Sequence, residues 1–439
     1  MRILLIILQF APDVNSNGLL FAQIVTDLAA RGHKVTVITA FPHYEEFRVW
    51  PEYRGKVAQR ERSNGIDVLR LYVHARGQKQ RFSNRFLSYL SFSLLALIAA
   101  LGSRRQYDVI VCPNGGFLTT VAAALAARIK RVPLLLNIQD LYPETPIRMG
   151  QVTSTRIIRV LRWLERFVYN RSDHISVITP YFRESLVANG VPHDRVSVIP
   201  NFVDSEFIRP LPRDNAFSQR NNLSSRFVVS HAGNLGYAYD LETLIAAAEL
   251  LRDRKDVLFL IVGNGVLRPV LDQRVRESGL DNVRFLPYQA REDVPWLRAA
   301  SDIQVALNRP GASLHSMPSK VYEIMASGRP VLASAERDSD LAKLIRESGC
   351  GVVVEPRDPH GLAEAIMRLY AAPELRLEMG ERGRRVAEEQ YSRAAVVAQY
   401  ERLLWTLVQP KDSFQSQEPA TEPVHPGHPG QSRRSPQTA

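Results

Sequence analysis

The feature that most constrains the fold is a repeated alternation of short apolar runs with longer amphipathic segments. The 439-residue chain opens with an apolar run at 2–8, an expected helix at 19–31 and a second apolar run at 34–39. A strand, a helix and a further strand in this order form a βαβ unit, which requires a parallel sheet. The alternation continues along the first half of the chain and predicts one parallel α/β domain over residues 1–205.

A second series of the same kind follows a change in composition. Residues 206–225 are polar and proline-bearing, which is typical of a linker. Strands and helices then alternate again over 226–390, and a closing helix is expected at 391–408. Residues 409–439 are rich in Pro, Gln, Ser and His and are expected to be disordered. The chain is therefore predicted to form two doubly wound α/β domains.

The net charge of +11 lies in the first domain. Residues 1–205 carry 26 Lys and Arg against 15 Asp and Glu, whereas residues 206–408 carry 27 of each. We therefore expect an anionic partner for the first domain, such as a membrane surface, a phosphorylated lipid or nucleic acid. The two cysteines lie far apart and predict neither a disulfide framework nor a Cys-based metal site, which fits a reducing cytoplasm.

An uncharged apolar segment lies within the most basic part of the first domain. No Asp or Glu occurs between Asp67 and Asp108, and cationic residues flank the expected helix at 86–102. This segment barely reaches across a bilayer, and the strands expected on either side belong to one sheet. A helix lying on the membrane surface is therefore favoured, with a buried core helix as the alternative. The cationic residues are Arg70, Arg76, Lys79, Arg81, Arg85, Arg104 and Arg105.

The candidate site centres on the sequence GASLHSMPSKVYEIMASGRPVLAS in the second domain. Pro318 suits the first turn of a helix, and Gly328 suits its end. In such a helix the N–H groups of Ser319 and Lys320 point outward at its positive end, where the Lys320 ammonium adds a charge that attracts phosphate. Glu323 lies on the same face and can accept hydrogen bonds from hydroxyls. A sugar diphosphate fits this pair; an ordinary surface Lys–Glu pair is the alternative.

Two further loops of the second domain place small residues between a strand and a helix. They contain Gly233 and Asn234 in the first loop, and Gly263, Asn264 and Gly265 in the second. Small residues allow a ligand to approach the backbone closely. Because the carboxyl ends of parallel strands meet at one sheet edge, we expect both loops to join the same binding site.

Loops at the corresponding edge of the first domain supply the other candidates. Asn17 and Gly18 follow the first strand, and Asp140 ends the strand of NIQDLYPE. A carboxylate that caps the next turn is the alternative for Asp140. The pair Asp338 and Asp340 has the spacing of some metal sites, but it precedes an expected helix, where Asp is favoured as a cap. We therefore predict no metal site.

The motifs NIQDLYPET, VSVIPNFVD, HAGNLGYAYDLETLIAAAELL, FLIVGNGVLRPVL and MPSKVYEIMASGRPVLAS, in this order, resemble the retaining family 4 glycosyltransferases of the GT-B architecture. The branch that builds bacterial surface polysaccharides, such as colanic acid and O-antigen, is the most similar. The resemblance covers 1–408. It implies two Rossmann-like domains that face a central cleft, with the nucleotide-sugar donor on the second domain and the acceptor on the first.

The chain departs from this family at two donor-binding positions. Glu323 matches the second glutamate of the family's Glu-x7-Glu motif, which holds the nucleotide ribose, but the first glutamate falls at His315. The family's Arg and Lys in the first loop of the second domain fall at Asn234 and Tyr239. The resemblance then implies that Lys320, together with Arg309, carries more of the diphosphate charge.

In much of the family a histidine precedes the residue that matches Asp140, and here that position is Gln139. Gln cannot transfer a proton, but it can hydrogen-bond a substrate hydroxyl. The residues expected to act in catalysis are thus Lys320, Asp140 and Gln139.

The sequence as a whole predicts an enzyme that transfers a sugar from a nucleotide-sugar, UDP being favoured over GDP, to a lipid-linked glycan such as a polyprenyl-diphosphate sugar. The resemblance implies that the anomeric configuration is retained, and no cofactor is expected. The enzyme is expected in the cytoplasm at the inner face of the plasma membrane, with an anionic membrane surface and no nucleic acid as partner. A nucleotide-sugar epimerase of the same fold and a non-catalytic, two-lobed binding protein are the alternatives.

Overall fold

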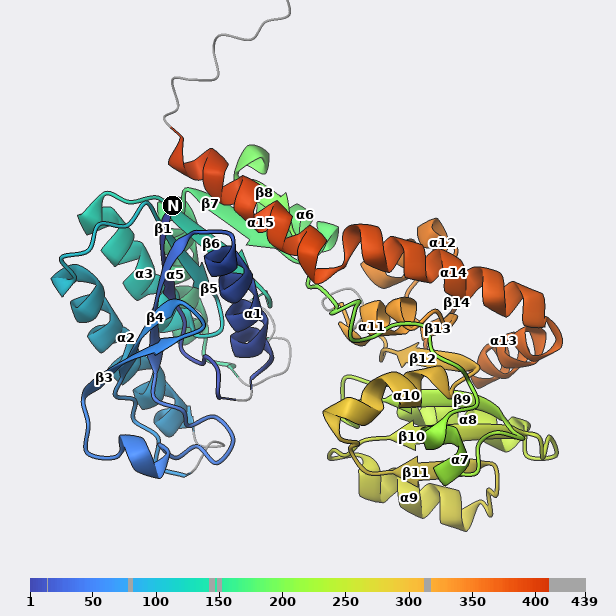
Figure 1. The fold of residues 1–439 in the computed structure, drawn as a ribbon. Coiled ribbons are helices and arrows are strands. Elements are labelled where there is room, and N and C mark those ends of the chain that lie inside the picture. The colour runs from blue at the N-terminus through green and yellow to red at the C-terminus, as the bar shows by residue number, and fades with distance from the viewer. Residues whose placement is uncertain (14, 78–81, 142–146, 148–151, 312–316, 410–439) are drawn as a thin grey trace, which may run out of the picture.

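The computed structural model of the chain describes all residues except 14, 78–81, 142–146, 148–151, 312–316 and 410–439. It consists of two lobes, each built on a sheet with helices on both faces (Figure 1). The sheet of the N-terminal lobe has the strand order β3-β4-β2-β1-β5-β6-β7-β8, and that of the C-terminal lobe has the order β11-β10-β9-β12-β13-β14. β3 pairs antiparallel with β4 at one edge, and the other strand pairs are parallel. The predicted pair of doubly wound α/β domains is confirmed.

The elements of the N-terminal lobe are β1 (Arg2–Ile6), α1 (Ser16–Ala30), β2 (Lys34–Ala40), β3 (Ala58–Ser63), β4 (Ile66–Leu71), α2 (Phe82–Gly102), β5 (Val109–Pro113), α3 (Phe117–Lys130), β6 (Leu134–Ile138), α5 (Thr155–Arg171), β7 (His174–Val177), α6 (Pro180–Ala188) and β8 (Val196–Val198). Those of the C-terminal part are α7 (Ala216–Arg220), β9 (Phe227–Ala232), α8 (Leu241–Leu250), β10 (Val257–Val262), α9 (Arg268–Glu277), β11 (Val283–Leu286), α10 (Val294–Ala299), β12 (Ile303–Leu307), α11 (Lys320–Ala326), β13 (Val331–Ser334), α12 (Asp340–Ser348), β14 (Gly351–Val354), α13 (Pro359–Ala371), α14 (Pro373–Gln390) and α15 (Arg393–Val408).

The central strands are continuous apolar runs because helices cover both of their faces. β10 has the sequence VLFLIV, and each of its residues is buried. The apolar side chains of β1 divide between two core clusters, one under α1 and α15 and the other under α2 and α3.

The last helix, α15, returns from the C-terminal lobe to the N-terminal lobe (Figure 1). Its buried residues join the core cluster under α1, and Tyr400 accepts a hydrogen bond of 2.9 Å from the side chain of Asn137 on β6. Arg393 pairs with Asp27 on α1, and Val203 forms a β-bridge with Ser392. The expected closing helix therefore completes the core of the N-terminal lobe.

The segment expected to be a plain linker contains a helix. Asn215 accepts hydrogen bonds from Phe217 and Ser218, which form the first turn of α7, and the Ser218 hydroxyl accepts one from the Asn215 N–H. This reciprocal cap starts a short helix in a sequence without a long apolar repeat. α7 packs against α10.

Helix α2 is neither fully buried nor fully exposed. Phe92, Ala96 and Ala100 are buried against the sheet and α3, whereas Leu94 and Ile98 on the opposite side are 53% and 66% exposed. By length and composition alone, Asn84–Gly102 could also cross a membrane. The alternative of a core helix therefore holds for one side of α2, and contact of its exposed side with a membrane stays a prediction.

Two of the arginines counted toward the basic surface are engaged by the fold. Arg70 is buried, and its side chain donates to Glu61 at 2.7 Å and to the carbonyl of Ala11 at 2.7 Å. Arg105 pairs with Asp67. Lys79 and Arg81 lie outside the described residues, whereas Arg85 and Arg104 are exposed. Arg70 therefore does not contribute to an exposed basic surface.

Candidate active site

The candidate donor site lies at the carboxyl ends of β10, β9 and β12, three neighbouring strands in the C-terminal lobe. The chain proceeds from β9 to β10 and β11 in one direction, and from β12 to β13 and β14 in the other. The loops after β9 and β12 therefore diverge between these two strands, which is where open α/β sheets leave space for a ligand. The glycine loops and α11 all meet here.

Three glycines bring the loops close together. A Cβ on Gly263 would lie 1.9 Å from the carbonyl oxygen of Gly233, and a Cβ on Gly265 would lie 2.5 Å from that of Leu235. Gly233, at a φ of 140°, also has a backbone conformation that other residues rarely adopt. Glycine is therefore required by both the backbone angle and the spacing, and the predicted meeting of the two loops is observed.

Lys320, the first residue of α11, points into this group of loops and is 9% exposed. Its Nζ lies 3.3 Å from Nε2 of His231 and 4.0 Å from the centre of the Tyr239 ring. A Cβ on Gly233 would lie 3.2 Å from the same Nζ. The ammonium thus stands at the junction of β9, the loop after it and α11.

The pKa of Lys320 is lowered to about 7, chiefly by burial and also by the charge of nearby Arg298, whereas Glu323 opposes the shift. Burial, followed by the charges of Lys320 and Arg298, also lowers the pKa of His231 well below its usual range. The imidazole is therefore neutral and can accept a hydrogen bond from the Lys320 ammonium. A buried cation with one neutral partner favours the approach of an anion.

Glu323 is held by a residue that the sequence did not reveal. The guanidinium of Arg298, itself 4% exposed, forms an ion pair with one carboxylate oxygen of Glu323. A second nitrogen of Arg298 donates to Gln304 at 2.6 Å. The Glu323 side chain remains 40% exposed. Arg298 therefore fixes the position of the Glu323 carboxylate. That Glu323 accepts hydrogen bonds from substrate hydroxyls stays a prediction, and it would use the lone pairs that do not contact Arg298.

The other predicted donor-binding residues lie around the same loops. Arg309 follows β12 and pairs with Glu242 at 2.6 Å, so its charge is largely compensated within the protein. The side chain of Asn264 accepts from the N–H of Gly265 at 2.8 Å, and its carbonyl accepts from Leu235. Asn234 also packs against Gly265. The two asparagines thus shape the loops.

Helix α11 begins slightly later than predicted. Regular α-helix starts at Lys320, with Ser319 as its N-cap residue. The carbonyl of Pro318 already accepts from the N–H of Val321, so Pro318 does lead the first turn. Gly328, with a φ of 67°, follows the last turn as predicted. His315 lies outside the described residues.

The candidate acceptor site lies at the carboxyl ends of β5 and β6 in the N-terminal lobe. Asn114, which the sequence analysis missed, donates to the carbonyl of Asp140 at 2.7 Å and accepts from the N–H of Gln139 at 2.9 Å. These bonds leave the Asp140 carboxylate open to solvent, while the surrounding protein raises its pKa by removing part of its hydration. The alternative for Asp140, a cap of the next turn, concerns residues 142–146, which lie outside the described residues.

Gln139 has a different place from the one predicted. Its side chain is buried, donates to Asn137 at 2.8 Å and accepts from Asn201 at 2.9 Å. Asn137 in turn bonds Tyr400 on α15. Both ends of the amide are thus engaged in a network that ties β6 to α15, which argues against a direct contact with a substrate hydroxyl.

The first loop of the N-terminal lobe reaches the same edge. Asn15 caps α1 by accepting from the N–H groups of Asn17 and Gly18. A Cβ on Gly18 would lie 2.8 Å from the carbonyl of Gln9, which explains why glycine is needed there. The side chain of Asn17 lies beside Gly115, in the loop that follows β5.

The two lobes contact each other where α6 of the N-terminal lobe and α12 of the C-terminal lobe begin. The N–H of Tyr181 donates to the carboxylate of Asp340 at 2.9 Å across the two lobes. Ser339, and not an aspartate, caps α12 by accepting from Ala342. Asp340 therefore begins α12 and joins the two lobes. The prediction that an aspartate caps this helix is wrong, because Ser339 is the cap residue.

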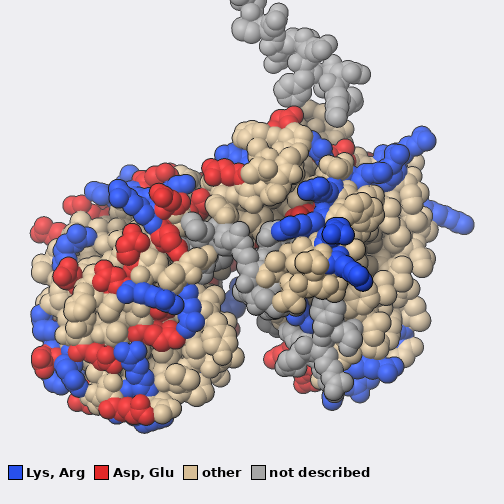
Figure 2. Space-filling view, turned by 180° about the vertical axis from the view of Figure 1, so that it is seen from behind, with Lys and Arg blue, Asp and Glu red and all other residues tan. Residues whose placement is uncertain are grey.

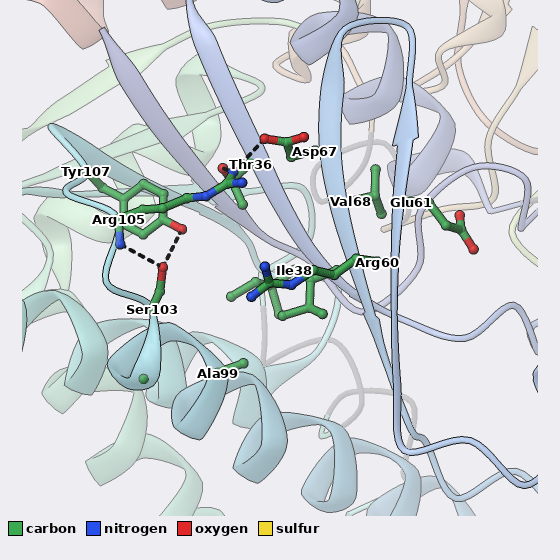
Figure 3. A pocket seen from close by; sticks show the side chains of 12 residues that line it. Thr36, Ile38, Arg60, Glu61, Asp67, Val68, Ala99, Ser103, Arg105 and Tyr107 are labelled. Carbon is green, nitrogen blue, oxygen red and sulfur yellow. Dashed lines mark hydrogen bonds and ion pairs between the residues drawn. The ribbon is translucent and has the colours of Figure 1, made fainter.

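One cavity of about 310 Å³ lies away from this site, between α2, the loop that follows it and the strands β2, β3 and β4. Figure 3 shows Arg60 and Arg105 reaching into it from opposite sides, with Ala99 beneath and the hydroxyls of Ser103 and Tyr107 bonded at 3.0 Å. Because it is at the opposite edge of the sheet, it is separate from the candidate active site.

Comparison with known proteins agrees with this architecture. Residues 20–201 match the family model of the glycosyl transferase 4-like domain, and residues 212–386 match that of the group 1 glycosyl transferases. In fold, the chain is similar to crystalline HepE of Anabaena in complex with UDP, at a TM-score of 0.70 and 18% identity over 92% of this chain and all of that one (100%). These matches define a two-domain enzyme of the GT-B architecture.

Two relatives are also named as glycosyltransferases. The Escherichia coli K12 protein WcaI, named for glycosyl transfer in colanic acid biosynthesis, is 26% identical over 381 residues, covering 85% of this chain and 93% of its own length. WbjE of Pseudomonas aeruginosa, named as a glycosyltransferase, is 26% identical over 294 residues, covering 66% of this chain and 73% of its own. The chain is a GT-B glycosyltransferase of the family 4 type.

Proposed function

We propose that the chain transfers a sugar from a UDP-sugar to a lipid-linked glycan, with retention of the anomeric configuration, in the synthesis of a bacterial surface polysaccharide. The observation that carries this proposal is the buried ammonium of Lys320 among the loops of Gly233, Gly263 and Gly265. A diphosphate between these loops gains a charge-assisted contact in a place of low dielectric constant.

The chemistry proposed for Lys320 is stabilisation of the leaving diphosphate. As the bond between the sugar C1 and the phosphate oxygen breaks, negative charge grows on UDP, and the ammonium offsets it. The acceptor hydroxyl attacks C1 from the same face and gives its proton to the departing phosphate oxygen. Asp140, with its open carboxylate, is proposed to orient that hydroxyl. No metal or other cofactor takes part in this scheme.

The proposed donor and the proposed acceptor are supported by different observations. HepE was solved with UDP and with UDP-glucose, which supports a nucleotide-sugar donor, with UDP-sugars as the first to test. The basic N-terminal half and the exposed side of α2 support an acceptor held at an anionic membrane, at the cytoplasmic face of the plasma membrane. The name of WcaI supports a role in exopolysaccharide synthesis.

A two-stage experiment tests the proposal. UDP, UDP-glucose and GDP-mannose are first compared for the rise in melting temperature that each produces, because a ligand that binds only the folded state raises it. UDP-sugars that stabilise the chain are then supplied with a polyprenyl-diphosphate-linked sugar, with and without EDTA. We expect stabilisation by uridine nucleotides and transfer that survives EDTA.

Each contrary result has its own meaning. Conversion of the UDP-sugar to its epimer without an acceptor would identify an epimerase. Stabilisation with no product would indicate a binding protein. Loss of transfer in EDTA that Mn²⁺ restores would promote Asp338 and Asp340 to metal ligands.

A further inference from the structure

Helix α5 carries apolar side chains that the core of the N-terminal lobe does not use. Within α5, all of whose residues the structure describes, Val168 alone is buried. Ile157, Val160 and Trp163 in its first half are 47%, 55% and 64% exposed. Three large apolar side chains exposed together on one helix are typical of a contact surface.

The helix is attached through its second half. Phe167 and Val168 pack into the cores shared with β6, β7 and α3, and Arg195 donates to the carbonyl of Tyr169 at 2.9 Å. The ring of Trp163 stacks on Phe167, with 6.1 Å between ring centres. The exposed apolar group is therefore held in place by the fold and does not depend on a loop for its position.

The polar residues around this group are almost all cationic. Exposed arginines occupy five positions of α5, and its one carboxylate, Glu165, accepts from the Tyr169 hydroxyl at 2.8 Å. Figure 2 shows Lys and Arg with few acidic residues on the face of the N-terminal lobe turned to the viewer, whereas both signs alternate over the other lobe. The five arginines are Arg156, Arg159, Arg162, Arg166 and Arg171.

Helix α2 offers a second exposed apolar surface, with Arg85 at its start and Arg104 just beyond its end. α2, α3 and α5 pack side by side on one face of the sheet. Near its start, Phe86 and Leu87 are 45% and 42% exposed beside Arg85. The helices α2 and α5 both follow strands at the sheet edge that holds Asn17 and Asp140, so their first turns lie toward that edge.

We propose that α5 and α2 together form one docking face for an anionic lipid bilayer, with Trp163 seated at the headgroup level. Arginines attract the anionic headgroups, and the aromatic and aliphatic side chains enter the boundary between headgroups and acyl chains. Two separated contacts restrict rotation of the lobe on the membrane. Because the first turns of α2 and α5 lie toward the sheet edge that holds Asp140, this orientation keeps that edge near the headgroups. This last point rests on the proposed function, because it matters only when the acceptor is lipid-linked.

A site-directed fluorophore tests the contact at α5 directly. Cys112 and Cys350 are both buried, so a cysteine introduced on the surface can be labelled selectively. Val160→Cys and Leu94→Cys report on α5 and α2, and Val270→Cys, at a residue 60% exposed on α9, is the matched control in the other lobe. Each labelled full-length protein is mixed with vesicles of phosphatidylglycerol and phosphatidylcholine, or of phosphatidylcholine alone.

We expect a blue-shifted, brighter emission at 160 and at 94 with anionic vesicles, and none at 270. A shift at 94 without one at 160 would overturn the role of α5. A shift at 160 that needs no vesicles and accompanies a doubling of the molecular mass would mean that α5 meets a second copy, and would also overturn it. An equal response to neutral vesicles would contradict the proposal that the arginines attract anionic headgroups.

A pair of double variants measures the size of the effect. Ile157→Ser with Val160→Ser should weaken partitioning into anionic vesicles by about tenfold, since two aliphatic side chains no longer leave water. Val270→Ser with Leu377→Ser, which removes two exposed aliphatic side chains from the C-terminal lobe, should change it little. Transfer to a water-soluble acceptor separates this result from the proposed function: it should be unchanged in both double variants, and its absence in the parent protein would contradict the function and not the docking face.

Discussion

The two lobes have the same βα plan but meet their surroundings in different ways. In the C-terminal lobe the loops approach each other so closely that a Cβ on Gly263 would lie 1.9 Å from a carbonyl oxygen, and the buried Lys320 lies beside them. In the N-terminal lobe the corresponding edge is open, and the distinctive features are exposed apolar helices and surplus positive charge. The comparison suggests that one lobe recognises a small ligand by exact contact, and the other recognises a surface by its overall chemistry.

The largest expected effect is that of Lys320→Ala. Loss of one charge-assisted contact in a site of low dielectric constant should cost about 2–4 kcal/mol of transition-state stabilisation, or roughly a 30- to 1000-fold loss of kcat/KM. The control is Lys343→Ala, an exposed lysine of the same lobe. Steady-state kinetics and melting temperature are measured for both. A nearly normal rate in the Lys320 variant would show that the enclosed site is not the donor site.

The next effect concerns the shape of the C-terminal lobe. Gly263→Ala places a Cβ 1.9 Å from a carbonyl oxygen and should lower the free energy of unfolding by about 1–3 kcal/mol, in addition to weakening the binding of UDP. Gly102→Ala in the N-terminal lobe, where a Cβ would meet nothing within 4 Å, is the control and should be close to neutral. Urea denaturation gives both values. Equal stability of the two variants would contradict the close approach of the loops.

A third prediction is that ligand binding by the C-terminal lobe depends on pH, whereas vesicle binding by the N-terminal lobe does not. The pKa of Lys320 is about 7 before an anion binds, and a bound diphosphate favours the ammonium, so the complex holds more protons than the free protein. The affinity for UDP-glucose should therefore decrease as pH rises above about 7, by at most about tenfold per pH unit. Lys320→Arg should flatten this dependence, because Arg stays charged. Calorimetry between pH 6 and 9 measures it.

Binding of the N-terminal lobe to anionic vesicles should show no such change over the same range, since it depends on arginines. A parallel loss of vesicle binding would mean that the two lobes respond to one titrating group, and the contrast between them would fail.

The smallest expected effect is that of surface charge on the N-terminal lobe. Arg85→Gln with Arg104→Gln removes two exposed cations, each contributing up to about 1 kcal/mol near an anionic surface, so vesicle binding should weaken by up to roughly 30-fold at low salt and much less at physiological salt. Arg276→Gln with Arg368→Gln, two exposed arginines of the C-terminal lobe, is the control. Transfer to a lipid-linked acceptor should slow only in the first variant. Equal behaviour of the two would place the membrane contact elsewhere.

Much of the fold could be predicted because hydrophobic periodicity and glycine positions are local properties of the sequence. The βα order, the two glycine loops and the end of α11 at Gly328 are of this kind. What could not be predicted depends on pairs that are distant in the sequence. His231 is 89 positions from Lys320, and nothing in either segment indicates that their nitrogen atoms lie 3.3 Å apart.

The candidate site shows the same division. Lys320 was found because a basic residue follows a proline at an expected helix start, but its burial, which shifts its pKa, results from packing against Tyr239. Arg298 lies in a short helix with no motif, so its pairing with Glu323 had no sequence signal. The exposed side of α5 was missed for a related reason: its apolar residues also fit a core helix, and only their exposure in the structure distinguishes the two.

The return of α15 to the N-terminal lobe has a consequence for biosynthesis. Val396, Val397, Tyr400 and Leu404 belong to the same core as β1, so that core lacks a wall until nearly the whole chain has been translated. The lobe that leaves the ribosome first is thus the last to be completed, and its apolar surface stays uncovered while the other lobe is made. A fragment that ends at residue 205 would remain in this unfinished condition, so the natural unit of folding is the chain through α15.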